Sequence, residues 1–473
     1  MSVPVLTAVT DPGLEARLAT AFGHPAMGVT VARRCVDLAD LLAAAATGKA
    51  RAVLVSGDLR RLDREALARL VAAGVVPVGL AGAGDEQAEQ RLRQLGVASV
   101  VTTETAPAAI AAALVEAAGR STSAGSTVGA SARGWADPLA ALPILDDAPH
   151  HVDTSGGYGP SGGDGTGQGR VVAVWGPTGA PGRSSVALHV AAEAALLGAR
   201  VLLVDADPYG GSISTLVGAV DEPPGLSAAC RTANAGVLDL VRLSALCRTV
   251  RLDAPAARGA GQAGQLLVLT GPPTAARWSE QRASSVEAVL EISRGLAELV
   301  VVDTGFSLET DEELAYDSLA PRRNGATLAA LDAADTVLAV GSADPLGLQR
   351  LIRGLGELSE AVPEGTVDVV VNRLRPGVVP GGSREQVEAA LLRHGGRAPL
   401  AYVPDDRAAF DAAVLSGRTL AEVSPGSPAR AALLGLAATL CGRPAPARRH
   451  RSWRGGRSST PRGAARRARS ARG

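Results

Sequence analysis

Aromatic side chains and lysine are nearly absent from this 473-residue chain. Phe, Trp and Tyr together make up 2% of it, and Lys49 is the only lysine. Hydrophobic residues still account for 46%, so the cores must be built from alanine, valine and leucine. The length is sufficient for two or three domains. Because positive charge is carried almost entirely by arginine, composition alone can account for an arginine such as Arg183 at a position where a lysine would be expected.

Closely spaced cysteines and long apolar runs are also missing. The four cysteines lie far apart and form no C-x-x-C pair, which argues against a zinc knuckle or a disulfide framework and predicts buried free thiols. No apolar run approaches the ~20 residues of a membrane span. The first ten residues lack the basic and apolar regions of a secretion signal. We therefore expect a soluble cytoplasmic protein.

A glycine-rich loop between a strand and a helix is the most informative segment. Residues 171–185 read VVAVWGPTGAPGRSS, and a helix is predicted over 186–197. Backbone N–H groups of such a loop, with the positive end of the helix, can cradle phosphate oxygens. Arg183 stands where a P-loop has its lysine, and Pro177 stands where it has its first glycine. The candidate phosphate-binding residues are Gly179, Ala180, Gly182, Arg183, Ser184 and Ser185.

Polar residues end three further apolar runs downstream. The run 201–204 leads into Asp205 and Asp207, the run 299–302 into Asp303, and the run 367–371 into Asn372 and Arg373. A single aspartate in such a place is usually a helix cap or turn residue. However, open α/β sheets bind ligands at the carboxyl ends of their strands. The repeated pattern therefore predicts a ligand site, with Asp303 suited to face a metal ion.

These motifs, in this order, resemble the MinD/ParA group of deviant-Walker P-loop ATPases over about residues 170–440. The segment 402–406, with 412–414 and 416–418, is similar to the stretch that closes the adenine pocket in that group. Within the group, the chain most resembles the CpaE/TadZ branch, in particular actinobacterial CpaE-like proteins described as septum-site-determining. That branch carries a receiver-like domain ahead of the ATPase.

The resemblance implies ATP and Mg²⁺ as cofactors and assigns roles to individual residues. Residues 179–185 would wrap the phosphates, with the Ser184 hydroxyl on Mg²⁺ and Asp303 holding the metal through water. Asp207 would orient the attacking water, and Asp205 would act on the magnesium side. The remaining expected nucleotide contacts are Asn372 at the adenine edge, Arg373 and Pro404.

Two departures from the family pattern concern catalysis. The family's signature lysine, which reaches the partner's nucleotide across a sandwich dimer, falls at Thr178, and the loop lysine is replaced by Arg183. Replacement by arginine keeps the charge but changes its reach and geometry. Threonine at 178 keeps no charge at all. Whether the chain hydrolyses ATP is thus left open, with weak ATPase activity as the preferred interpretation.

Residues 1–118 alternate short apolar runs with helical patterns, which predicts five strands and five helices in a doubly wound domain resembling a response-regulator receiver. A receiver needs an acceptor aspartate at the end of its third strand and a lysine at the end of its fifth. Here Asp58 is displaced past Ser56, and Thr103 stands near the lysine position. We expect an interaction module rather than a phosphoacceptor.

The predicted organisation is an α/β chain of four parts. The receiver-like domain (1–118) is followed by a flexible Gly/Ser-rich linker (119–169), a MinD/ParA-like P-loop ATPase domain with a mostly parallel doubly wound sheet (170–442) and a disordered tail (443–473). The tail holds eleven arginines and no acidic residue, so the rest of this neutral chain carries about −11. Such a tail could bind DNA or an anionic membrane, fold back on the acidic body, or do nothing.

Three functions fit these observations. The first is an ATP-dependent homodimer that positions cell machinery, either at the septum site or at a Tad-type pilus or secretion apparatus, with the tail suited to the inner face of the plasma membrane. The second is a non-hydrolysing scaffold of the same fold. The third is a ParA-like DNA-partition protein that uses the basic tail. Asp205, Asp207 and Asp303 favour retained metal chemistry, whereas Thr178 and Arg183 favour the scaffold.

Overall fold

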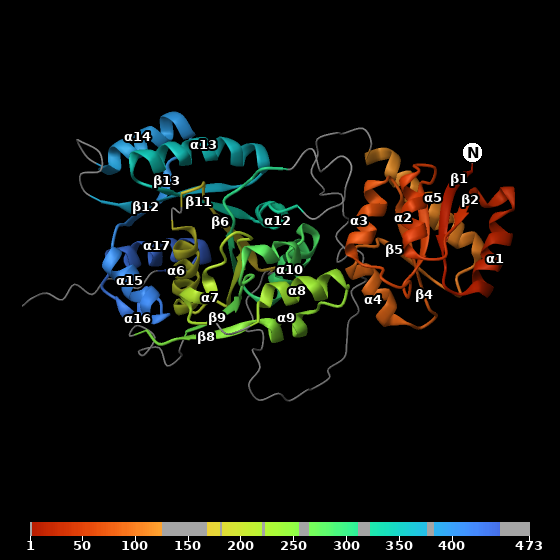
Figure 1. Cartoon of the computed structure of the whole chain (residues 1–473), viewed down its shortest axis with the longest axis horizontal. Coiled ribbons are helices and arrows are strands. Elements are labelled where there is room, and N and C mark those ends of the chain that lie inside the picture. Colours follow the sequence, from red (N-terminus) through yellow and green to blue (C-terminus); the bar gives the residue numbers. More distant parts are fainter. Residues whose placement is uncertain are drawn as a thin grey trace, which may run out of the picture.

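The computed structural model describes residues 2–124, 168–179, 182–219, 223–254, 264–310, 322–375 and 383–444. These residues form two α/β units, each built on its own sheet (Figure 1). All strand pairings are parallel except that of β8 with β9. The α/β class expected from the sequence is therefore observed. No helix among the described residues is both long enough and apolar enough to cross a membrane.

The first unit carries a five-stranded parallel sheet in the order β2-β1-β3-β4-β5. This order is one of the two common ones among doubly wound sheets. The receiver-like assignment itself remains a prediction. The elements are β1 (Val3–Ala8), α1 (Pro12–Phe22), η1 (Pro25–Met27), β2 (Val29–Arg34), α2 (Leu38–Ala46), β3 (Ala52–Ser56), α3 (Arg64–Ala72), β4 (Val76–Ala81), α4 (Glu86–Gln94), β5 (Ser99–Thr102) and α5 (Pro107–Ala124).

Aspartate caps begin four of the helices in this unit. The carboxylates of Asp11, Asp37, Asp63 and Asp85 each accept a hydrogen bond from a backbone N–H in the first turn of α1, α2, α3 and α4. A short acidic side chain at this position satisfies an otherwise unpaired donor and complements the helix dipole. Helix α5 continues to Ala124, beyond the domain boundary predicted at residue 118.

The second unit carries an eight-stranded sheet in the order β13-β12-β11-β6-β10-β7-β9-β8. Its elements are β6 (Arg170–Trp175), α6 (Arg183–Leu196), β7 (Val201–Ala206), α7 (Ile213–Leu216), α8 (Gly225–Asn234), α9 (Leu240–Leu246), β8 (Arg248–Leu252), β9 (Gly264–Leu269), η3 (Ala275–Glu280), α10 (Ala283–Leu296), β10 (Leu299–Thr304), α12 (Gly325–Asp332), β11 (Thr336–Ser342), α13 (Pro345–Ala361), β12 (Val367–Leu374), α14 (Ser383–Gly395), β13 (Pro399–Pro404), α15 (Arg407–Ser416), α16 (Leu420–Val423) and α17 (Pro428–Cys441).

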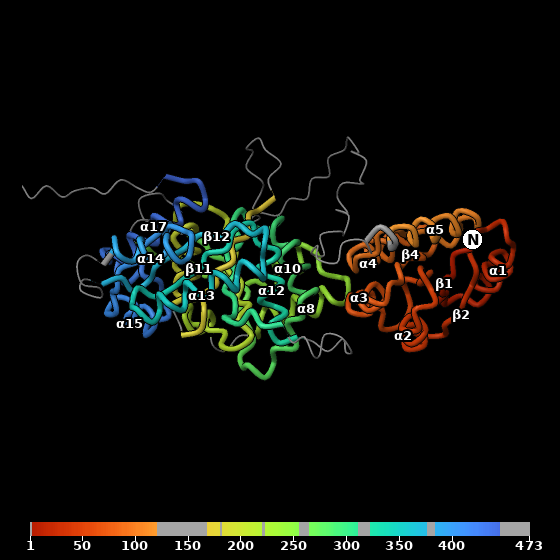
Figure 2. Tube along the Cα trace, turned by 90° about the horizontal axis from the view of Figure 1, so that it is seen from above, coloured from red at the N-terminus to blue at the C-terminus, as the bar shows by residue number. Residues whose placement is uncertain are grey.

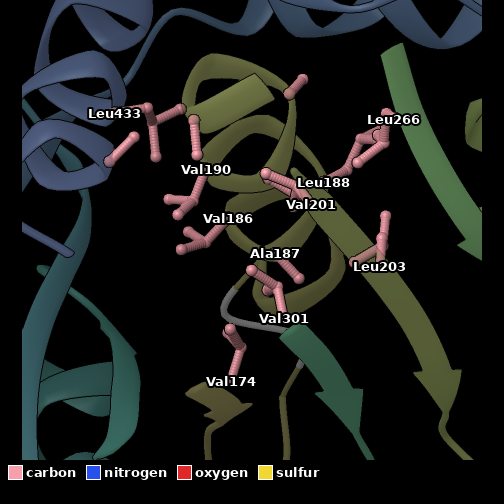
Figure 3. Close-up of a cluster of buried hydrophobic side chains, with 14 of the residues drawn as sticks. Val174, Val186, Ala187, Leu188, Val190, Val201, Leu203, Leu266, Val301 and Leu433 are labelled. Carbon is pink, nitrogen blue, oxygen red and sulfur yellow. The ribbon is translucent and has the colours of Figure 1, made fainter. Parts of the chain in front are cut away.

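Helices cover both faces of this sheet, so its central strands are buried on both sides. Alternate residues of β6 point to opposite faces: Val172 and Val174 pack with α6 and α17, whereas Val171 packs with α8 and α10. Strands buried on both faces read as continuous apolar runs, which is why β6, β7 and β10 could be predicted. Figure 3 shows α6 packed on β7 and β10, with Leu433 of α17 beside it at the upper left.

The two units touch through α3 and α4 on one side and α8 and α10 on the other (Figures 1 and 2). The Asn234 amide donates to the Asp63 carboxylate at 3.1 Å, and the Arg91 guanidinium donates to the Ala235 carbonyl at 3.2 Å. Gly236 lies directly against Leu95, because a Cβ at Gly236 would be 2.6 Å from the Leu95 Cγ. The end of α8 thus packs directly against the first unit, and Arg282 at the start of α10 adds an ion pair with Glu65 of α3.

A buried ion pair joins α6 to α17. The Arg430 guanidinium contacts both Glu193 carboxylate oxygens, at 2.6 and 3.1 Å, and the Glu193 side chain is only 2% exposed. Burial raises the pKa of Glu193, and the bond from Arg430 opposes that rise. The arginine therefore compensates a buried carboxylate on α6, the helix that follows the glycine-rich loop.

Removing this arginine should destabilise the second unit strongly. Arg430→Ala leaves Glu193 buried without its cation, a change that typically costs about 3–5 kcal/mol. Arg353→Ala, which breaks the exposed pair of Arg353 with Glu357 on α13, should cost less than about 1 kcal/mol. Denaturant unfolding of both variants measures the difference. Since an unpaired Glu193 is tolerated only when protonated, the Arg430→Ala defect should grow as pH rises; equal losses in the two variants would contradict this account.

Candidate functional site

The glycine-rich loop leaves the carboxyl end of β6 and enters the amino end of α6. Gly179 and Gly182 have φ values of +107° and +87°, a region that favours glycine. A Cβ at Gly182 would overlap the Asn372 amide nitrogen, so space as well as backbone conformation requires glycine there. Ala180, expected to bind phosphate, lies outside the described residues. The described part of the loop has the backbone that a phosphate cradle needs.

Arg183 begins α6, but its guanidinium turns back beneath the loop. One terminal nitrogen donates to the Gly176 carbonyl at 2.9 Å, and the other lies 3.5 Å from an Asp207 carboxylate oxygen. The guanidinium also lies 6.0 Å from the centre of the Phe306 ring. Its side chain is 11% exposed. In this arrangement Arg183 ties the start of the loop to Asp207, and its charge is already compensated.

Three aspartates meet beside the loop at the carboxyl edge of the sheet. In the parallel pairing of β10 with β7, Asp303 is the register partner of Asp205. Asp205 and Asp303 are fully buried, and Asp207 is 5% exposed. Ser184 and Ser185 follow in the first turn of α6, where they are half-buried. The structure therefore brings together the three carboxylates and the hydroxyls that the sequence predicted as one site.

Asp205 is held by the backbone that follows it. Its carboxylate accepts from the N–H of Ile213 at 3.1 Å and from the N–H of Asp207 at 3.3 Å. Burial raises the pKa of Asp205 to about 7; the Ile213 bond opposes the rise, and the charge of Asp207 adds to it. The carboxyl group is fixed in position and titrates near neutral pH.

Asp303 has no such support. Neither of its carboxylate oxygens has a hydrogen-bond partner among the described residues, although both are buried. Burial raises its pKa well above the usual range, and the charge of Asp205 adds to this. The nearby Ser184 hydroxyl and Arg183 guanidinium oppose the shift without making a bond of ordinary geometry. Buried oxygens left without partners next to a second carboxylate are what a divalent cation would satisfy.

Asp207 is positioned by residues that the sequence pattern did not identify. Its carboxylate accepts from the Tyr209 N–H at 2.8 Å, and the Tyr209 hydroxyl donates to the side-chain amide oxygen (Oδ1) of Asn324 at 2.7 Å. The Tyr209 and Phe306 rings contact each other, with 4.9 Å between centres and a tilt of 40° between planes. In a chain with so few aromatics, two rings beside candidate site residues were a signal that could have been used. Nothing in the sequence indicated Asn324, because it lies more than 100 residues after Asp207 and belongs to none of the motifs.

The residues expected around the base occupy two neighbouring strand ends. Asn372 and Arg373 end β12, Pro404 ends β13, and Leu374 is the register partner of Pro404. Arg373 has a φ of +56°, rare for a residue other than glycine. Asn372 is buried, and its amide lies against the loop at Gly182. Its role at an adenine edge remains a prediction.

A separate cavity lies in the first unit, where β1, β3 and β4 end. Its volume is about 180 Å³, and Asp11, Asp58, Asp85 and Thr103 are among its lining residues. The Asp58 carboxylate accepts from the Thr10 hydroxyl at 2.7 Å. None of the described residues that line the cavity is basic. The role of this unit as an interaction module remains a prediction.

No family model matches the chain, and no curated protein matches it. Among solved structures it is similar to a ParA family ATPase from Chlorobium tepidum TLS, with 19% identity over 58% of this chain and 100% of that chain and a TM-score of 0.44. It is also similar to the septum site-determining protein MinD complexed with Mg-ADP from Pyrococcus horikoshii OT3. The identity is 16%, the match covers 57% of this chain and 95% of that chain, and the TM-score is 0.44. A third similar structure is the cell division ATPase MinD from Pyrococcus furiosus, with 16% identity over 57% of this chain and 98% of that chain and a TM-score of 0.43. Likeness at this level leaves the argument about function to the residues described above.

Neutralising Asp303 should stabilise the protein in the absence of metal and nucleotide. The folded chain retains protons on Asp205 and Asp303 that the unfolded chain loses near pH 3.8, so stability should fall as pH rises from about 4 through about 7. Asp303→Asn removes the free-energy cost of ionising one of these buried carboxyl groups. Its melting temperature at pH 8 should therefore exceed that of the parent by at least ~2 °C. Asp411→Asn, at an exposed site on α15, should change nothing. A lower melting temperature for Asp303→Asn would show that the carboxylate stabilises the fold.

Proposed function

We propose that this chain is a nucleotide-dependent positioning ATPase that binds Mg-ATP at the loop between β6 and α6. The observation that carries the proposal is the pair of buried carboxylate oxygens of Asp303, which have no hydrogen-bond partner among the described residues. They lie beside Asp205, and the neighbouring loop has two left-handed glycines in its described part. A protein that had lost metal binding would have no use for this costly arrangement. It therefore supports ATP and Mg²⁺ as the ligands.

The residues present fit the two cofactors. Backbone N–H groups of 179–185 would take the phosphates, and the Ser184 hydroxyl and Asp303 would hold Mg²⁺. When bound, the ion would neutralise charge that develops on the transferred phosphoryl group. Asp205, anchored by Ile213 and adjacent to Asp303, would act on the magnesium side.

Asp207 is the residue we assign to the attacking water. One of its oxygens is fixed by the Tyr209 N–H, and the other faces Arg183 at 3.5 Å. A carboxylate held in this way can orient a water. With Thr178 in place of the family's lysine, the site also lacks a cation reaching toward a partner. Slow hydrolysis is the expected result.

Binding should depend on Asp303 and turnover on Asp207. The full-length protein should melt at a higher temperature with millimolar Mg-ATP, because the ligand binds only the folded state. Asp303→Asn should lose this gain, whereas Asp207→Asn should retain it and lower phosphate release by at least ~10-fold. Thermal melts and a phosphate-release assay measure the two effects. If the parent protein binds no Mg-ATP in thermal melts and in calorimetry, the proposal is wrong. Binding of Mg-ATP without phosphate release would favour the non-hydrolysing scaffold.

The finer proposals concern assembly and cellular role. We propose an ATP-dependent homodimer, because Thr178 and the edge of the sheet with the three aspartates would face a partner in the arrangement implied by the resemblance to the MinD/ParA group. The dimer would recruit septum, pilus or secretion proteins, with the first unit as an interaction module. The ParA-like DNA-partition role is the alternative, supported by the arginine-rich tail.

The tail provides a test that needs no knowledge of the partner. Residues 443–473 carry eleven arginines and, apart from Arg443 and Pro444, lie outside the described residues. If they anchor the protein, the full chain should bind anionic vesicles or duplex DNA at low salt and be released at moderate salt. A chain ending at residue 444 should lose this binding and retain Mg-ATP. Preference for DNA would support partition, preference for vesicles would support positioning at a membrane, and equal co-sedimentation of both chains would refute the anchor.

A further inference from the structure

Arg350, which belongs to none of the motifs above, reaches the glycine-rich loop from α13. A Cβ at Gly179 would overlap a terminal nitrogen of Arg350, so the guanidinium rests directly on the Cα of that glycine. Gly179 adopts a φ of +107° at this point. The contact joins residues far apart in the sequence and places a positive charge at the surface of the candidate phosphate cradle.

The same guanidinium lines a cavity of about 180 Å³. The loop (177–179) forms one wall, the end of β11 with the first turn of α13 forms another, and Arg373 from the end of β12 completes it. A water needs only about 10–15 Å³ of such space, so a tetrahedral oxyanion can enter. Two arginines from separate elements thus converge on one hollow beside the loop.

One acidic residue, Asp344, is found among the described residues that line this cavity, and it is already engaged. Its carboxylate accepts from the Gly347 N–H at 2.9 Å, where it caps α13, and from the Ser342 hydroxyl. These bonds, that of Ser342 first, lower its pKa, so it remains charged. Its oxygens thus accept hydrogen bonds at the start of α13. With two arginines and one aspartate, the described lining has a net charge of +1.

Arg350 and Arg373 are free to bind an anion in a way that Arg183 is not. Among the described residues, neither guanidinium of this pair makes a hydrogen bond or an ion pair. Arg183, by contrast, donates to the Gly176 carbonyl and faces Asp207. The arginine inside the loop motif is therefore occupied with structure, and the arginine outside it is available for a ligand.

We propose that Arg350, assisted by Arg373, binds the terminal phosphate of the nucleoside triphosphate whose other phosphates lie in the loop. This inference rests on the proposed function and deepens it. Arginine suits the task because its planar fork can donate two hydrogen bonds to one phosphate. Arg350 would supply, from α13, the cation that the loop lacks at Thr178, and it would make the site prefer a triphosphate to a diphosphate.

Calorimetry on the full-length protein tests this assignment with Mg-ATP, Mg-ADP and pyrophosphate as probes. Arg350→Ala should weaken Mg-ATP by at least ~10-fold, in line with the loss of a charged hydrogen bond, and should change Mg-ADP by less than ~3-fold. Arg350→Lys should restore part of the loss, and Arg373→Ala should show a smaller loss of the same kind. Arg353→Ala is the matched control, because Arg353 lies on the same helix, is 72% exposed and pairs with Glu357.

The outcomes separate the two proposals. If the parent binds Mg-ATP and Arg350→Ala binds it equally well, the assignment of Arg350 is wrong and the proposed function stands. If the parent binds pyrophosphate through Arg350 but not Mg-ATP, the anion pocket stands and the proposed function fails. If it binds neither, both are wrong. If the circular dichroism spectrum shows that Arg350→Ala is not folded, the affinities of Arg350→Lys and Arg373→Ala for Mg-ATP are compared with that of Arg353→Ala instead. Affinities equal to that of Arg353→Ala would show that the assignment of Arg350 is wrong.

Discussion

The constraint on which this molecule depends is the burial of three carboxylates at one edge of a sheet. Asp205, Asp207 and Asp303 are almost entirely shielded from water, and their charges repel one another. The surrounding structure compensates unequally: backbone N–H groups hold Asp205, Tyr209 and Arg183 hold Asp207, and Asp303 has no partner among the described residues. That inequality distinguishes residues that support the site from the residue left to meet a ligand.

The glycine-rich loop is the second half of the same arrangement. In the proposed function its backbone would supply the positive ends of N–H dipoles, and the ionised aspartates would supply negative charge nearby, so a ligand that carries both signs would satisfy the two. A phosphate with a divalent cation has this character. The two buried cores on either side of the sheet, one centred on α6 and the other on α8 and α10, hold the loop and the strand ends in register.

Much of this could be predicted from the sequence, for a definite physical reason. Strands buried on both faces are continuous apolar runs, and parallel strands bring their carboxyl ends to one edge, so Asp205, Asp303 and Asn372 could be placed together before the structure was known. The direction of the Arg183 side chain could not be predicted from the sequence, because the partners of a guanidinium depend on which groups the tertiary fold places near it. Arg350 was missed because it meets Gly179 only through the adjacency of β11 and β6. The domain boundaries and the assigned role of each site residue remain predictions.

Trp175, the last residue of β6, gives the site a further property. Its side chain is fully buried, its indole N–H donates to the Phe306 carbonyl at 3.2 Å, and Gly354 of α13 lies against the far edge of its ring. The indole therefore touches both the segment that follows Asp303 and the helix that carries Arg350. Because the chain holds four tryptophans, a variant that keeps Trp175 alone would allow changes around the loop to be followed by intrinsic fluorescence.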